Sequence, residues 1–193
     1  MHPEPPVDKH EIRAVYDDQV IRVYQAYSPT IADTALQRQR FVAPPFKMDR
    51  MTWIKPSFLW MMYRAGWGHK EAVQSRILAI DLSHEGWRWA LAHSCASHRP
   101  ADMLPEAWAR LKQSAPVRIQ WDPERDLHFT ALPHRSIQVG LSGEAVSRYV
   151  HEWTRRISDV TPLAHRIGAL VAHGDLNEAQ ALLPVERPYP ARA

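Results

Sequence analysis

The segment SRILAIDL, residues 75–82, constrains the fold of this chain more than any other segment. It is a short apolar run that is rich in Ile and Leu and is bounded by polar residues. A run of this length and composition is typical of a strand buried inside a sheet, because a buried helix is usually longer. We therefore expect residues 75–82 to form a buried strand with other strands beside it.

Strand and helix signals are mixed along the rest of the chain. Val, Ile and aromatic residues predict further strands at residues 20–27, 50–54, 117–121 and 135–141. Caps and apolar periodicity predict helices at residues 28–39, 56–65, 84–93, 104–114, 143–153, 161–174 and 175–183. Between two of the strands, DPERD at residues 122–126 is interpreted as a turn.

This order of elements favours the α+β class. We expect one domain over residues 1–193, with a curved, mostly antiparallel sheet, flanking helices and a helical C-terminal part from Gly143 that covers one face. The hydrophobic content of 45% is enough for such a core. Residues 1–9 are predicted to be a flexible lead-in, and residues 184–193 a loose, Pro-rich tail.

The sequence lacks the motifs that several classes of protein require. No run of about 18 apolar residues marks a membrane span, and Cys95 is the one cysteine, which favours a reducing, cytoplasmic setting. Walker A, GxGxxG and GxSxG motifs do not occur. His93, Cys95 and His98 lie close in sequence, but a closed zinc site needs a fourth ligand, so no metal site is predicted.

Basic charge and tryptophan concentrate in one region. Residues 36–76 hold eight Lys or Arg and two acidic residues, although the whole chain has a net charge of only +3. Trp53, Trp60 and Trp67 lie in the same region. Local positive charge attracts anions, and a flat indole can stack on a base. The alternative for the cations is a solvated surface, and for the tryptophans it is core packing.

The junction between strand 50–54 and the following helix is the first candidate site. Ser57 stands at the helix start, where unpaired backbone N–H groups can accept an anion. Lys55 would act there as a phosphate clamp, and Trp53 or Trp60 would supply a surface for a base. The residues predicted to bind ligand in this region are Arg50, Trp53, Lys55, Ser57 and Arg64.

Other strands carry further candidate residues. In RVYQAY, Arg22 and Tyr24 share one strand face, and Arg22 either binds an anionic ligand or forms a structural ion pair. Later strands add guanidinium and amide donors that would converge if the strands pair as a hairpin, unless neighbouring acids neutralise them: Arg118, Gln120, Arg135 and Gln138. Glu144, at the start of the next helix, is either a carboxylate favoured by the helix dipole or a catalytic acid.

These segments also carry a resemblance to known families. RAVYDDQVIRVYQAYSPTIADTAL, RMTWIKPSFLWMMYRAGWG, VRIQWDPERD and RSIQVGLSG resemble the signature segments of domain-of-unknown-function family 4291, whose label implies no activity. The unit RVYQAYSPTIADTAL is also similar to the first strand and helix of the ADP-ribosyltransferase-like fold, with Arg22 at the matching place. That second resemblance implies NAD as a candidate cofactor. The late strand RSIQVGL lacks the expected Glu, so Gln138 or Glu144 would have to serve in catalysis.

Three functional hypotheses follow from the sequence. In the first, a basic, Trp-lined cleft binds a phosphate-bearing ligand, namely a nucleotide, NAD or an RNA end, and the protein is an ADP-ribosyltransferase-like enzyme. In the second, it is a non-catalytic nucleic-acid-binding module. In the third, it is a structural or partner-binding domain whose tryptophans belong to the core. The oligomeric state is left open.

Overall fold

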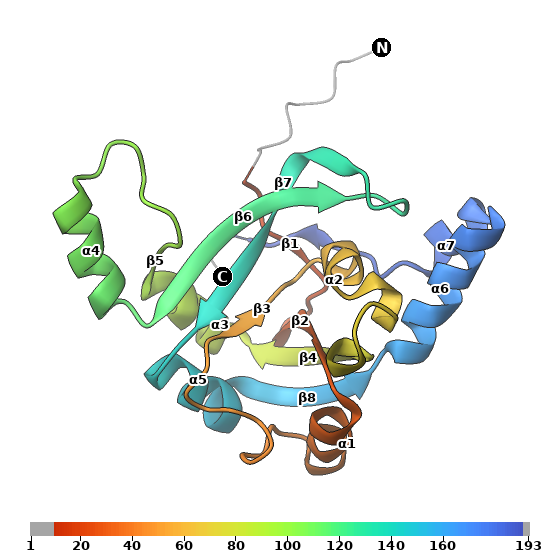
Figure 1. The fold of residues 1–193 in the computed structure, drawn as a ribbon, viewed down its shortest axis with the longest axis horizontal. Coiled ribbons are helices and arrows are strands. Elements are labelled where there is room, and N and C mark those ends of the chain that lie inside the picture. The colour runs from red at the N-terminus through yellow and green to blue at the C-terminus, as the bar shows by residue number, and fades with distance from the viewer. Residues whose placement is uncertain (1–9, 191–193) are drawn as a thin grey trace.

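The computed structural model describes residues 10–190 (Figure 1). The strands are β1 (Arg13–Ala14), β2 (Val20–Tyr27), β3 (Thr52–Ile54), β4 (Arg76–Ser83), β5 (Ser94–Ala96), β6 (Val117–Arg125), β7 (Ala131–Leu141), β8 (Thr154–Asp159) and β9 (Arg187–Pro188). The helices are α1 (Pro29–Arg38), α2 (Phe58–Ala65), α3 (His84–Ala92), α4 (Pro105–Ser114), α5 (Glu144–Arg148), α6 (Thr161–His173) and α7 (Leu176–Leu182). Short 3-10 turns η1 (Gly66–Gly68) and η2 (Ala72–Gln74) and a π-helical turn η3 (Tyr149–Trp153) complete the fold. The predicted α+β class is confirmed.

The strands form three sheets rather than one. The first has the order β2-β4-β8 and is antiparallel throughout. The second has the order β3-β7-β6-β5, with β5 as its one parallel member, and the short pair β1-β9 makes the third. Figure 1 shows the long strands β6 and β7 curving across the top of the fold. The two larger sheets meet where the Tyr24 N–H of β2 donates to the Lys55 carbonyl at 2.7 Å.

Strand β4 lies at the centre of the core, as its apolar sequence predicts. Successive side chains of a strand point to opposite faces. Accordingly, Leu78, Ile80 and Leu82 pack in one cluster with residues of α1 and α3. Ile77 and Ala79 pack in the other cluster with α2, α6 and α7. Because both faces of β4 are covered, its apolar residues from Ile77 to Leu82 are almost completely buried.

Local capping signals set the bounds of α2, the helix nearest the candidate site. The Ser57 hydroxyl accepts a hydrogen bond from the Trp60 N–H at 3.0 Å, which satisfies one of the free donors of the first turn. Gly66 ends the helix in a left-handed conformation with φ of 57°. The predicted inward stripe of this helix, which includes Phe58 and Met62, is buried. Helix α2 therefore ends where the sequence predicts and begins at Phe58, two residues later than predicted, with Ser57 as its N-cap.

Several elements differ from the sequence prediction: strands β1, β5, β8 and β9 were not expected, and β6 extends beyond residues 117–121. The segment 122–125 continues β6 instead of turning, because Asp122 pairs with Ser136 of β7 across the sheet. The turn follows at Asp126, whose carboxylate accepts the N–H groups of His128 and Thr130. Strand β8 was not predicted, because it follows a helical turn without a Gly or Pro break and buries only Ile157 among its residues.

The C-terminal segment is ordered by contacts with the N-terminal part of the chain. Strand β9 pairs with β1, and the Tyr189 N–H donates to the Ile12 carbonyl at 2.7 Å. Tyr189 is buried against the core. The prediction of a loose tail is therefore wrong for residues 184–190, because a buried tyrosine and a strand pair hold this segment. Residues 1–9, predicted to be a flexible lead-in, and residues 191–193 lie outside the described part of the chain.

Over residues 10–190, no helix has the length and apolar character that crossing a membrane requires.

Candidate functional site

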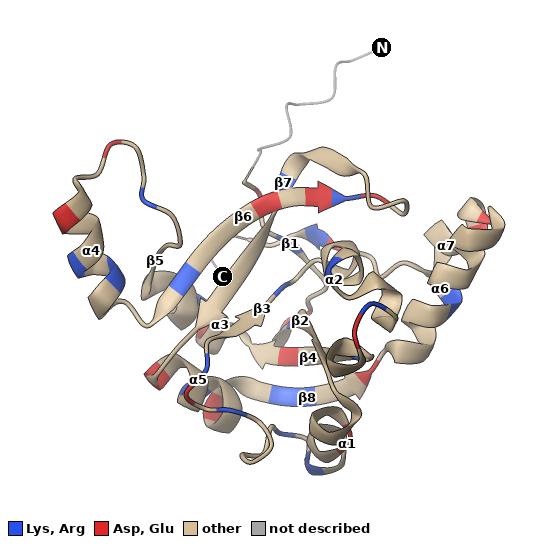
Figure 2. Cartoon of the chain, viewed as in Figure 1, with Lys and Arg blue, Asp and Glu red and all other residues tan. Residues whose placement is uncertain are grey.

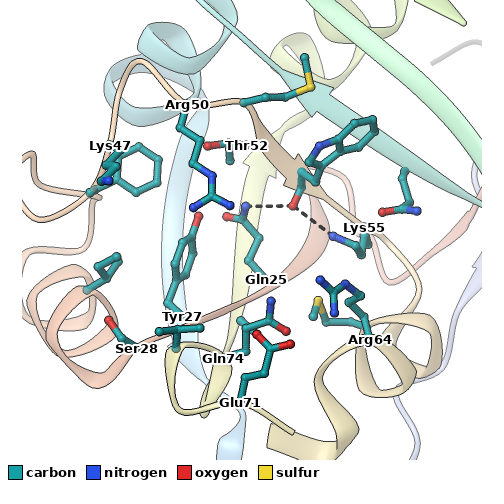
Figure 3. Close-up of a pocket in the computed structure, with 18 of the residues that line it drawn as sticks. Gln25, Tyr27, Ser28, Lys47, Arg50, Thr52, Lys55, Arg64, Glu71 and Gln74 are labelled. Carbon is teal, nitrogen blue, oxygen red and sulfur yellow. Dashed lines mark hydrogen bonds between the residues drawn. The ribbon is translucent and has the colours of Figure 1, made fainter. Parts of the chain in front are cut away.

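A cavity of about 830 Å³ lies beside the junction between β3 and α2 (Figure 3). Strand β2, strand β3, helix α2 and the loops at residues 45–51 and 71–74 surround it, and β6 and β7 each add a glutamine. The polar and charged residues that line it are Gln25, Tyr27, Ser28, Lys47, Arg50, Thr52, Lys55, Arg64, Glu71, Gln74, Gln120 and Gln138, and two of its aromatic residues are Trp53 and Trp60.

The floor of the cavity is made of buried polar side chains. Gln25, Thr52, Lys55 and Gln138 are only 5–7% exposed. Burying polar groups is costly unless they are hydrogen-bonded, so such residues rarely gather at one place without a reason. Gln25 is held on both ends of its amide: its nitrogen donates to the Trp53 carbonyl at 3.0 Å, and its oxygen accepts from the Tyr149 hydroxyl at 2.6 Å. The floor is therefore polar and fixed in orientation.

Lys55 is the buried cation of this floor. Its Nζ lies 3.4 Å from the Trp53 carbonyl oxygen, a long hydrogen bond, and 5.3 Å from the centre of the Trp60 ring. Burial, together with the nearby positive charge of Arg64, lowers the pKa of this amine to about 7, and Asp122 acts in the opposite direction. Near neutral pH, Lys55 is thus a mixture of charged and neutral amine.

The rim of the cavity carries exposed cations. Lys47, Arg50 and Arg64 are exposed and line the cavity, and Glu71 is the carboxylate on the lining among the described residues. Figure 3 shows the Arg50 side chain pointing toward the Tyr27 hydroxyl and the Gln25 amide. Charges of both signs are spread over the other elements, so this gathering of cations is a local feature (Figure 2). The site therefore combines a polar floor with a basic rim.

Two aromatic side chains face this space in different ways. Trp53 lies flat against Gly140, its partner on β7, where an added Cβ would approach the indole ring to 3.0 Å. Trp60 is buried, and its Nε1–H has no hydrogen-bond partner among the described residues. The Gln74 Oε1 is also unpartnered. A buried donor and a buried acceptor thus lack partners on two residues that line one cavity, and each such group is costly to leave unpaired.

The structure brings together half of the residues predicted to form the site. Six of them line the cavity: Arg50, Trp53, Lys55, Arg64, Gln120 and Gln138. The Gln120 and Gln138 side chains both donate to the Asp122 carboxylate, which orients their amides. The strand-to-helix junction identified in the sequence therefore does open onto a cavity.

Two predicted residues of the first strand are used elsewhere. Arg22 forms a two-point ion pair with Asp81 of β4, with distances of 2.7 and 2.9 Å, which is the structural alternative considered for it. Tyr24 is buried in the core, and its ring packs edge-on against Phe58. Both face away from the cavity because Gln25, the alternate residue of β2, faces toward it.

The later strands also correct the expected set. The Arg118 guanidinium turns back to the carbonyls of Lys112 and Ala115 at the end of α4. Arg135 is exposed and donates to the Trp121 carbonyl at 3.0 Å. Arg118 and Arg135 therefore do not converge with Gln120 and Gln138 on one cavity, because each arginine donates to backbone carbonyls elsewhere.

Ser57 and Glu144 lie outside this cavity as well. The Ser57 hydroxyl caps α2 and donates to Glu124 at 2.9 Å, so it faces a second cavity. Glu144 is exposed on α5 and pairs with Arg148 one turn later. The first turn of α2 is therefore occupied by protein groups, and Glu144 lies in the first turn of α5, where it is paired on the helix surface.

Sequence reasoning missed several lining residues. Gln25, Tyr27 and Thr52 contribute polar groups from strands, Lys47 comes from the loop before β3, and Glu71 and Gln74 come from the turn η2 and its start. A glutamine between apolar neighbours in β2 was the available signal for Gln25. The others carry no local signal, because their positions depend on how the loops pack over the sheet.

The second cavity, of about 430 Å³, lies at the other side of the α2 N-terminus. Glu186 Oε1 accepts the Phe58 N–H at 2.7 Å and thereby ties the C-terminal segment to the helix. Burial, with the nearby charge of Glu124, raises the pKa of Glu186 to about 8, and burial also raises the pKa of Glu124. These carboxyls, rather than a bound anion, satisfy the helix start.

Comparison with known protein families gives one match. Residues 11–189 fit the family model described as a domain of unknown function, DUF4291. The resemblance noted from the signature segments is thereby confirmed for nearly the whole described chain. No curated protein matches the sequence. The match adds no support to the resemblance to ADP-ribosyltransferases.

Proposed function

The chain belongs to the family DUF4291, and because that description assigns no activity, we propose a function from the cavity itself. The cavity binds a phosphate-bearing ligand, namely a nucleotide, NAD or an RNA end. One observation carries this proposal: exposed cations at the rim and buried polar side chains at the floor line the same 830 Å³ space.

The rim supplies the groups that an anion requires. Arg50 and Arg64 present planar guanidinium groups, which match phosphate oxygens in two-point hydrogen bonds, and Lys47 adds a compact charge. All three are exposed, so their charges are hydrated before a ligand arrives and cost little to maintain. We therefore assign the phosphate to the rim.

The floor and the tryptophans suit the remainder of a nucleotide. The amides of Gln120 and Gln138 are held in fixed orientations, because each donates to the Asp122 carboxylate. Trp53 offers a flat apolar surface that every base can stack on. The volume lies within the range of typical small-molecule sites. A base on Trp53 with its edge toward the glutamines uses each of these features.

The transferase reading receives less support than binding alone. Arg22, the residue that matches the ADP-ribosyltransferase-like pattern, is paired with Asp81, and Glu144 lies outside the cavity. We therefore retain NAD as a candidate ligand and do not assign Glu144 a catalytic role. Within the proposal the protein acts in the cytoplasm, and the support for this is the buried and unpaired state of Cys95.

Thermal-shift titration tests the proposal. NAD, ADP-ribose, AMP, ATP and a 5′-phosphorylated RNA oligonucleotide are each added to the full chain. A ligand present at 100 times its dissociation constant raises the melting temperature by roughly 5–10 °C for a protein of this size. Arg50→Ala and Arg64→Ala should remove most of that shift, whereas Arg110→Ala, on the exposed face of α4, should not. No shift with any of these compounds refutes the proposal.

The same titration separates the alternative function. A nucleic-acid-binding module would bind RNA much more tightly than a mononucleotide, and that binding would weaken steeply with added salt. The cavity, by contrast, predicts that AMP or ADP-ribose competes with the RNA end at a single site. A failure of mononucleotides to compete would favour the module.

A further inference from the structure

We propose that Lys55 is a nucleophilic amine that forms an imine with a ligand bearing both a phosphate and an aldehyde or ketone. This inference rests on the proposed function, because it uses the same cavity and the same basic rim. It changes the role of Lys55 from a phosphate clamp, as the sequence suggested, to a reactive group on the floor.

The position of the amine supports this role. Lys55 is 7% exposed and is one of the residues that line the cavity, so a ligand in this space would contact a lysine that is largely shielded from bulk water. Among residues 10–190, the one hydrogen-bond acceptor of this amine is the Trp53 carbonyl at 3.4 Å, and the Nζ lies 5.3 Å from the centre of the Trp60 ring. A long bond to one carbonyl leaves the nitrogen free to turn toward a bound carbonyl carbon.

The charges around Lys55 favour the neutral amine. None of the ion pairs among residues 10–190 includes Lys55. The positive charge of Arg64 on α2 disfavours a charged Lys55, whereas the carboxylate of Asp122 on β6 favours it. The Asp122 carboxylate already accepts hydrogen bonds from the amides of Gln120 and Gln138. Desolvation beside a second cation is the usual way in which a lysine becomes a nucleophile.

The reaction is balanced without another reagent. The Nζ lone pair attacks the carbonyl carbon, a C–N bond forms, and the carbonyl oxygen takes a proton. The second proton of the amine then leaves with that oxygen as water, and a C=N bond replaces the C=O bond. Amine and carbonyl therefore give imine and water, with no oxidant or reductant. The phosphate, held at the rim by Arg50 or Arg64, would align the carbonyl with the floor.

Reductive trapping tests this inference. The full chain is treated at pH 7 with pyridoxal 5′-phosphate, which carries a phosphate and an aldehyde, and the imine is reduced with cyanoborohydride. Peptide mass spectrometry should show Lys55 labelled roughly tenfold faster than the other described lysines, since a neutral amine is the reacting form. Lys112 is the matched comparison, because it also lies over an indole, that of Trp108 at 4.6 Å, but is exposed.

Two further variants complete the test. Lys55→Met should lose the fast label, and Lys112→Met should retain it. Arg50→Ala should slow labelling by pyridoxal 5′-phosphate but not by pyridoxal, which lacks the phosphate. If Lys55→Met does not fold, the ratio of labels at Lys55 and Lys112 within the wild-type protein still decides the question.

The outcomes distinguish this inference from the proposed function. If nucleotides stabilise the protein but Lys55 is labelled no faster than Lys112, the imine inference is overturned and the binding proposal stands. If Lys55 is labelled fast and equally by both aldehydes, while no nucleotide stabilises the protein, the nucleophile stands and the phosphate ligand is refuted. Fast, phosphate-dependent labelling that AMP slows supports both.

Discussion

Replacing Lys55 with methionine should stabilise the protein, and the gain should shrink as the pH rises. In the folded chain burial lowers the pKa of Lys55 from 10.5 to about 7. The unfolded chain therefore binds more protons than the folded chain between pH 7 and 10.5. The stability of the wild-type protein consequently rises with pH across that window, and below about pH 7 the full free-energy cost of burying the charged amine is present. Methionine has a similar shape and carries no charge.

The size of this effect follows from the two pKa values. With 10.5 in the unfolded state and about 7 in the folded state, the penalty is about 4–5 kcal/mol at pH 6 and about 2 kcal/mol at pH 9. The advantage of Lys55→Met over wild type should thus fall by roughly 2–3 kcal/mol between these pH values. Packing differences between the two side chains do not depend on pH, so the slope isolates the charge.

Urea unfolding followed by tryptophan fluorescence measures this slope. Free energies of unfolding are determined for both proteins at pH 6, 7.5 and 9, with similar m-values required for the comparison. Other titrating groups are present in both proteins and cancel in the difference. Lys112→Met, at an exposed site, should show no such slope. A difference for Lys55→Met that is constant from pH 6 to 9 would refute the reasoning, since it would mean that Lys55 keeps an ordinary pKa.

Three other substitutions test the contacts around the site. Gly140→Val should destabilise the fold by about 1–3 kcal/mol in urea unfolding and shift the Trp53 fluorescence, because the new Cβ would lie 3.0 Å from the indole ring. Unchanged stability and an unchanged spectrum would contradict this prediction. Arg22→Met should lower the free energy of unfolding by about 3 kcal/mol, because it leaves Asp81 buried and unpaired, and the double variant Arg22→Met with Asp81→Leu should recover most of that stability. The thermal shifts caused by nucleotides should persist in both variants, and their loss in a folded variant would place Arg22 at the site. Because the pKa of Glu186 is raised from 4.5 to about 8, the folded state holds an extra proton between these pH values, and the stability of the wild-type protein falls as the pH rises through them. The stability of Glu186→Gln relative to wild type should therefore increase from pH 5 to 8 in urea unfolding. A difference that does not change with pH would argue against a buried acid.

The helices and strands were largely predictable, because their signals act over a few residues. Ser57 and Gly66 bound α2 by satisfying the ends of that helix. The apolar run in β4 required cover on both faces and received it. Strand β8 escaped prediction because its segment is mostly polar and its pairing with β4 supplies what its own sequence lacks.

The candidate site was predictable only in part. The basic, Trp-containing junction pointed to Arg50, Trp53 and Lys55, and these do line one cavity. Arg22 could not be assigned from sequence, because its partner Asp81 lies 59 positions away and only strand pairing brings the two together. Nor could the sequence show that Gln25 faces the cavity while Arg22 faces away from it, since this depends on which elements pack against each face of β2.

The sequence by itself determined the α+β class, the buried central strand, the N-caps of α2 and α3 and the family, because hydrophobic periodicity and capping are local properties of a chain. The tertiary structure alone decided which cations are paired and which face open space. It ties Arg22 to a carboxylate and Arg118 to backbone carbonyls, and it leaves Arg50 and Arg64 at the rim of a cavity. That choice depends on which groups come within a few ångströms after strands from distant parts of the chain have paired, and charge acts through those distances rather than through order in sequence.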